Sequence, residues 1–265
     1  MAAEDLPKSA WQLSKFVWAP ALGLKGIMRN RLFRHVFSSA QTGVGGGSLV
    51  YGGVLFRAQP AFFEDVQWRS LGPWSARLQP HYDTAERMLG VQTAPFDAPT
   101  QQLTKELAQH FRAEGSFTRA PIGVFFGEPG KTVKDPYFGG EGPDRTGCTR
   151  CGSCLVGCHV GAANTLTKNY LWFAEKRGVQ IQAEHEVVDV TPLGAADGSE
   201  GYRVITKRPG AWLNHNRQTH TARGSFSRVD RWAPMSCLPT ASTAALCPAS
   251  ATGWANWCAP TARPC

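Results

Sequence analysis

The stretch that decides the fold is Gly43–Phe63, which reads "GVGGGSLVYGGVLFRAQPAFF". It opens with a turn made almost entirely of glycine, and glycine lets backbone N–H groups approach a ligand closely and adopt positive φ. When a regular element follows at once, such N–H groups can cradle a pyrophosphate or lie against a flat ring. A flexible linker is the alternative, but a linker does not continue into an apolar, β-prone run such as Leu49–Phe56. The turn is therefore a candidate cofactor loop.

Downstream of this stretch, the sequence predicts three helical segments and then a β-hairpin. Pro80 is expected to interrupt the first helical segment. Thr100 and Gly115 are expected to begin and end the second, and Asn164 is expected to cap the third. The segments are 73–90, 101–115 and 165–178 for the helices, and 179–193 and 202–208 for the strands. This order predicts a mixed α/β or α+β enzyme domain.

The composition of the 265 residues is globular, with 42% hydrophobic and 18% charged residues. The net charge is +8, but the basic residues are scattered singly, so nucleic acid is not an expected partner. The opening "MAAEDLPK" is not a signal peptide, and the apolar stretch "FVWAPALGL" is too short to span a bilayer. We therefore expect a cytoplasmic protein with no transmembrane segment and with reduced thiols.

Four of the eight cysteines form a tight cluster with the spacing C-x2-C-x2-C-x3-C. This spacing is typical of ferredoxin-type loops, and glycines between the cysteines supply the turns that bring four thiolates together. A 4Fe–4S cluster or zinc is one interpretation, and a cysteine-rich turn packed under a helix is the other. On the first interpretation the protein is an iron–sulfur electron-transfer protein or a zinc-stapled module. The candidate metal ligands are Cys148, Cys151, Cys154 and Cys158.

Several longer stretches, in the same order, resemble the glucose–methanol–choline (GMC) oxidoreductases, in particular their cholesterol-oxidase-like branch. The glycine stretch is similar to the segment of these enzymes that contacts the flavin. The resemblance continues through "LQPHYDTAERMLGV", "GCTRCGSCLVGCHVGAANTLTKNYL" and "GVQIQAEHEVVDV", and it reaches about residue 224. The fold it implies is part of a GMC FAD-binding domain with part of a substrate domain.

The resemblance implies an FAD enzyme that oxidises the CH–OH group of a small, sterol-like alcohol by hydride transfer to the flavin. It implies that Val187 meets the adenine through its backbone. The resemblance also implies that Tyr51 lies beside the flavin, where well-known cholesterol oxidases have asparagine, and this departure bears on the substrate more than on the cofactor. The residues expected to line the flavin and its pyrophosphate are Gly45, Gly46, Gly47, Ser48, Tyr51 and Gly52.

The resemblance is incomplete at both ends of the chain. The family's N-terminal dinucleotide fingerprint, G-x-G-x-x-G, is absent from the sequence. Beyond about residue 224, back-translation with the frame moved by one nucleotide restores a likeness to the family, so we interpret the rest as out-of-frame text. The family's catalytic histidine and its partner residue lie beyond this point, so no catalytic residue is assigned. We expect an inactive fragment that neither binds FAD tightly nor oxidises alcohol.

These observations predict four regions along the chain. The first is part of the FAD-binding domain, with the glycine loop, and the second begins the substrate domain. The third carries the cysteine loop, a helix and a β-hairpin that returns to the FAD domain, and the fourth is the out-of-frame tail. The regions are 1–72, 73–147, 148–224 and 225–265.

Overall fold

The computed structural model describes residues 6–9, 11–195, 197–210 and 216–224. The chain divides into two compact units, and all of the first unit precedes residue 184. Among the described residues, the first unit holds 6–9, 11–19 and 23–183, and the second holds 20–22, 184–195, 197–210 and 216–224. The expected tail, 225–265, lies outside the described residues, so its interpretation stays a prediction, as do the four predicted regions.

The first unit begins with short elements that lead into the glycine loop. They are α1 (Leu13–Phe16), β1 (Trp18–Ala19), η2 (Pro20–Leu22, which belongs to the second unit), β2 (Leu24–Lys25), β3 (Met28–Leu32) and β4 (Phe37–Gln41). β1 pairs with β2, and β3 pairs with β4, both antiparallel. The hairpin β3–β4 therefore delivers the chain to η3 (Gly46–Leu49), whose end is buried in a small core. That core consists of Leu6, Ile27, Leu49 and Val50, with Met28 against it.

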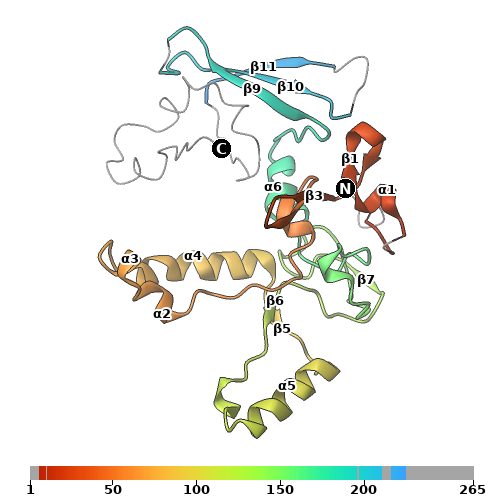
Figure 1. The fold of residues 1–265 in the computed structure, drawn as a ribbon, viewed down its shortest axis with the longest axis vertical. Coiled ribbons are helices and arrows are strands. Elements are labelled where there is room, and N and C mark those ends of the chain that lie inside the picture. Colours follow the sequence, from red (N-terminus) through yellow and green to blue (C-terminus); the bar gives the residue numbers. More distant parts are fainter. Residues whose placement is uncertain (1–5, 10, 196, 211–215, 225–265) are drawn as a thin grey trace. The chain divides into compact units, whose positions relative to one another are not determined.

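After the glycine loop, the chain forms α2 (Pro60–Phe63), α3 (Val66–Arg69) and α4 (Trp74–Leu89). The predicted interruption at Pro80 is wrong, because α4 is a single unbroken helix (Figure 1) and Pro80 lies inside its bounds. Proline removes only one N–H donor from the ladder. Thr84 Oγ1 donates to the Pro80 carbonyl at 2.9 Å, and side-chain contacts from outside the helix hold its second half. Gly90 ends α4 in the left-handed conformation, as the sequence indicates.

The second helix is α5 (Pro99–His110), between β5 (Gln92–Thr93) and β6 (Pro121–Ile122), which pair antiparallel. The predicted limits are wrong at both ends. The N-cap is Ala98, whose N–H donates to Gln101 Oε1 at 2.8 Å, and the following Pro99 has its φ already fixed for a helix. The helix ends at His110, before η4 (Glu114–Ser116) and well before Gly115.

The rest of the first unit carries the cysteine loop. It comprises β7 (Thr132–Val133), β8 (Arg145–Thr146), η5 (Ser153–Leu155), η6 (Leu166–Lys168) and α6 (Tyr170–Lys176). The predicted helix cap, Asn164, is wrong: α6 begins at Tyr170, whose N–H donates to Asn169 Oδ1 at 2.6 Å. Asn164 is buried instead, and its side chain accepts a hydrogen bond from Arg145.

The second unit holds one antiparallel sheet in the order β11–β10–β9 (Figure 1). The predicted hairpin is confirmed, although its first strand begins at Glu186 rather than at residue 179. The strands are β9 (Glu186–Pro192), β10 (Tyr202–Lys207) and β11 (Gln218–Ala222). Helices with small antiparallel sheets confirm the predicted mixed α/β class. No helix in the described part of the chain is long and apolar enough to cross a membrane.

Candidate functional site

The glycine turn is anchored by one side chain, Ser48. Its hydroxyl donates to the Gly45 carbonyl at 2.7 Å and accepts from the Leu166 N–H at 2.9 Å. Leu166 begins η6 and lies 118 residues further along the chain. One serine therefore closes the turn on itself and also ties it to the segment that follows the cysteine loop.

The glycines of the turn differ in what surrounds them. Gly45 has φ +106°, and a Cβ there would lie 3.2 Å from Leu49 and 3.3 Å from Thr167, so this position faces the protein. Gly46 has φ +53° and nothing within 4 Å of a Cβ, and Gly47 has only the Gln41 side chain, at 3.8 Å. Gly46 and Gly47 therefore present an open backbone surface, which suits a flat ring or a phosphate.

Two further glycines of the stretch serve close packing. Gly52 has φ +73°, and a Cβ there would lie 3.0 Å from Leu155 Cδ2. Gly53 has φ +83°, and a Cβ there would lie 3.2 Å from Val124 Cγ2. Both positions favour glycine for conformational and steric reasons. The Gly52 contact brings the exit of the glycine loop against the cysteine loop.

The Tyr51 hydroxyl points into the protein, where it is close to the carbonyl oxygens of Asn164 and Gly123, at 3.1 and 3.3 Å. Burial, followed by the nearby thiols of Cys154 and Cys158, raises the pKa of Tyr51 to about 12. A phenol with such a pKa stays protonated and acts as a donor. Tyr51 therefore links the glycine loop to two distant backbone segments through its hydroxyl.

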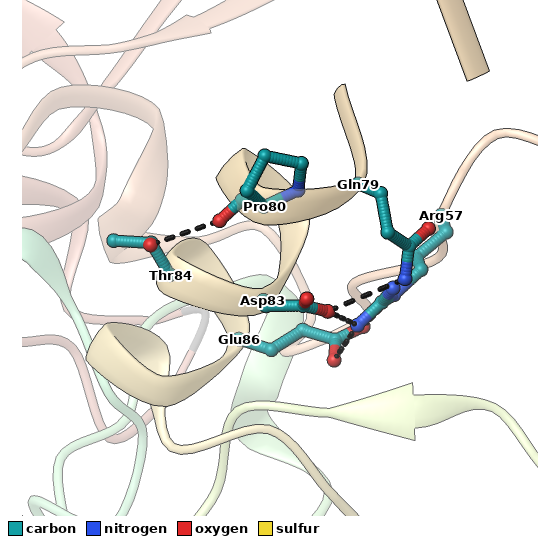
Figure 2. Close-up of polar contacts among 6 residues, drawn as sticks. All are labelled: Arg57, Gln79, Pro80, Asp83, Thr84 and Glu86. Atoms are coloured by element: carbon teal, nitrogen blue, oxygen red, sulfur yellow. Dashed lines mark hydrogen bonds and ion pairs between the residues drawn. The ribbon is translucent and has the colours of Figure 1, made fainter. Parts of the chain in front are cut away.

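The chain leaving the glycine loop is held on α4 by Arg57, as Figure 2 shows. The Arg57 guanidinium makes two bonds to Glu86, at 2.6 and 2.5 Å, and one to Asp83, at 2.8 Å. These hydrogen bonds lower the pKa of the Glu86 carboxyl. The paired bonds to Glu86 have the fork geometry that favours arginine over lysine. Arg57 was not singled out from the sequence, because an isolated basic residue carries no motif.

The cysteine loop lines a cavity of about 430 Å³ together with Gly52 and apolar side chains that include Phe96 and Val124. All four candidate metal ligands border this cavity, so the sequence spacing does gather them in one place. All four are free cysteines. Among the described residues, however, no three His, Cys, Asp or Glu side chains form a group that could hold a metal ion. The structure gives no support to the iron–sulfur prediction.

Beneath the loops lies a buried polar cluster that sequence reasoning missed. Arg145 is 1% exposed and donates to Asn164 Oδ1 at 2.8 Å and to the Lys168 carbonyl at 2.7 Å. Burial lowers the pKa of Arg145. Burial, and then the charge of Arg145, lowers the pKa of Lys168 to about 8, and its amine donates to the Gly161 carbonyl. These residues join β8 to η6 and so support the segment on which Ser48 is anchored.

Val187 lies on β9 in the second unit, where it pairs with Thr206 across a register shift, and it is 49% exposed. Its expected contact with adenine stays a prediction. The residues of the glycine loop, by contrast, are contiguous within the first unit and belong to one anchored turn.

Curated proteins with sequences similar to this chain are cholesterol oxidases. The chain is 43% identical over 235 residues, 86% of its length, to a cholesterol oxidase of Mycobacterium tuberculosis. It is 41% identical over 226 residues, 83% of its length, to a cholesterol oxidase of Acinetobacter baumannii. The chain is a homologue of the cholesterol oxidases. This finding confirms the resemblance to the cholesterol-oxidase-like branch of the GMC oxidoreductases.

The match covers most of this chain but less than half of each cholesterol oxidase. The chain spans about two fifths of the length of the curated relatives it matches, with 40% and 41% of their lengths covered. No family model matches the chain.

Proposed function

We propose that this chain is part of an FAD-dependent oxidoreductase that oxidises the CH–OH group of a sterol-like alcohol. The observation that carries the proposal is the open backbone surface at Gly46 and Gly47, on a chain homologous to enzymes named cholesterol oxidase. A bound FAD would supply the acceptor for the hydride that leaves the alcohol carbon. No described residue is assigned as the catalytic base.

The residues of the loop would divide the work of holding the flavin. Gly46 and Gly47 would face it, while Gly45 turns the backbone and Ser48 fixes the turn through its two hydrogen bonds. Tyr51 would act through its ring and backbone, because its hydroxyl is already engaged with two carbonyl oxygens. The cavity beside Gly52 leaves room for an apolar group next to the loop.

We also propose that the 265-residue chain alone binds FAD weakly. It lacks the G-x-G-x-x-G fingerprint, whose helix N-terminus commonly holds the pyrophosphate. We expect the purified chain to carry little flavin, to bind added FAD reversibly, and not to reduce it when a sterol is added. Flavin present in a one-to-one ratio after purification would contradict this proposal but would support the flavin site. Iron and acid-labile sulfide without any flavin binding would contradict the flavin proposal itself.

A matched pair of variants tests the glycine surface. Gly46→Asn places a side chain on the open face, and asparagine tolerates left-handed φ better than other residues. Gly139→Asn is the control, because Gly139 has φ +65° and is also open. In a titration followed by flavin fluorescence, we expect Gly46→Asn to weaken FAD binding by about tenfold or more, that is, by about 1.4 kcal/mol. We expect Gly139→Asn to bind like the unmodified chain. Equal binding by both variants would remove the loop from the site.

A further inference from the structure

The cavity beside the cysteine loop has a buried apolar wall. Its volume of about 430 Å³ lies within the range of about 300–1,000 Å³ that is typical of pockets for small molecules. Val124, Ala162 and Ala163 line this wall, and all three are buried. Their side chains offer no hydrogen bond to a ligand. The wall therefore suits an alkyl chain, which gains free energy when it leaves water.

A cationic side chain, Arg150, borders the same cavity and is exposed. Its guanidinium carbon lies 4.0 Å from the centre of the Phe96 ring, which also lines the cavity. The Phe96 ring packs edge-on against Phe126 of the cavity, with 5.7 Å between the ring centres. A guanidinium that lies over an aromatic ring is held by a cation–π contact and keeps its N–H donors around its edge. Arg150 is thus held where the apolar cavity meets solvent.

The carboxylate on the cavity wall does not neutralise Arg150. That carboxylate, Asp97, accepts a hydrogen bond from Lys105 at 2.5 Å and forms an ion pair with Arg119 at 2.7 Å. Two cations meet one carboxylate there, so this group adds a positive charge to that of Arg150. Among the residues that the structure describes, no carboxylate forms an ion pair with Arg150. The cavity therefore combines an apolar wall with a positively charged rim, which complements an anionic amphiphile.

From the buried apolar wall and the cation held at its rim, we propose that this cavity binds a medium-chain aliphatic carboxylate, an anionic amphiphile of the fatty-acid class. The carboxylate accepts two parallel N–H bonds from the Arg150 guanidinium, and the alkyl chain lies against Val124, Ala162 and Ala163. Burial of the alkyl chain supplies the affinity, and charge pairing selects the acid over the corresponding alcohol. The proposal does not rest on the flavin site, because no flavin takes part in the binding.

The test is calorimetric titration of the 265-residue chain, without flavin, with decanoate and with decanol as its neutral counterpart. We expect decanoate to saturate a single site. Arg150→Gln should raise the Kd for decanoate by about tenfold or more, because it removes a charged hydrogen-bond donor. The same variant should change the Kd for decanol by less than about twofold, because the alkyl chain keeps its wall.

Arg112→Gln is the matched control, because Arg112 is also an exposed arginine with left-handed φ, +52° against +60° for Arg150. Arg112 does not line the cavity, so this variant should bind decanoate like the unmodified chain. The proposal is overturned if decanoate does not saturate one site, or if the two arginine variants bind it equally well. An equal loss of decanoate and decanol binding in Arg150→Gln would overturn it as well.

A decanoate analogue that carries a diazirine locates the site after illumination and peptide-resolved mass spectrometry. We expect crosslinks within 122–126 and 160–163, which hold the buried wall, and excess decanoate should suppress them. Crosslinks on exposed apolar side chains instead, such as Leu103 and Phe111, would show surfactant-like binding and overturn the proposal. This experiment and the FAD titration can fail independently, so failure of one proposal is distinguishable from failure of the other.

Discussion

Replacing Tyr51 by phenylalanine should destabilise the chain near neutral pH and stabilise it in strong alkali. The change removes one hydroxyl from a buried position and keeps the ring. At neutral pH the variant loses the hydrogen bonds to the carbonyls of Asn164 and Gly123. The Gly123 carbonyl still accepts the Asn164 N–H at 2.8 Å. The main loss is therefore the hydrogen bond to the Asn164 carbonyl. The expected loss in unfolding free energy is about 1 kcal/mol.

The sign reverses at high pH because the pKa of Tyr51 is raised in the folded chain. The phenol ionises at about 12 when folded, against an ordinary value of 10.0. The unfolded chain therefore releases the proton first, and stability contributed by the protonated phenol is lost as the pH rises from 10 to 12. The raised pKa contributes about 2.7 kcal/mol to the unfolding free energy, and about 1.4 kcal/mol of this contribution is lost by about pH 11. The phenylalanine variant has no such loss.

The assay is urea unfolding followed by circular dichroism, at a series of pH values between about 8 and 11. Tyr51→Phe should be less stable than the unmodified chain at the lower end and equal or more stable at the upper end. Tyr170→Phe is the control for the loss of a surface phenol, since Tyr170 is 46% exposed. A stability difference for Tyr51→Phe that does not change with pH would refute the reasoning, because it would mean that the hydroxyl is not buried in a protonated state.

Two further predictions concern the unfolding free energy, one for glycines of the two loops and one for Lys168 of η6. Gly53→Ala should reduce the unfolding free energy by about 2 kcal/mol or more, since it combines left-handed φ with a Cβ 3.2 Å from Val124. Gly152→Ala is the comparison, because a Cβ there would have nothing within 4 Å, and it should lower the unfolding free energy measured in urea by only about 1 kcal/mol. Equal losses for the two variants would show that packing at Gly53 is unimportant. For Lys168, the folded pKa of about 8 lies below the ordinary 10.5, so its charge opposes folding until the pH rises through this window. Between pH 8 and 10.5, the unfolding free energy of the unmodified chain should therefore rise by up to about 3 kcal/mol relative to that of Lys168→Met. A difference in unfolding free energy that stays constant over this pH range would contradict the prediction.

Much of the local structure could be predicted from neighbouring residues alone. The Gly90 helix end and the β9–β10 hairpin follow from rules that act over a few residues, and both are confirmed. The failures have a common cause. Pro80 sits inside α4, and Asn164 is not a helix cap, because contacts with distant residues outweigh the local preference. No pattern of neighbouring residues predicts that Arg145 will donate a hydrogen bond to the Asn164 side chain.

The glycine turn and the cysteine spacing are visible in the sequence because glycine conformation and thiol proximity depend on residues that are close along the chain. What each residue does within these motifs depends on the tertiary structure. Ser48 finds its partner 118 residues away, and Tyr51 finds one of its partners 113 residues away. Tertiary packing also leaves Cys151 exposed and encloses Cys154. Burial and hydrogen bonding set the chemistry of a side chain, and both are decided only when distant segments pack together.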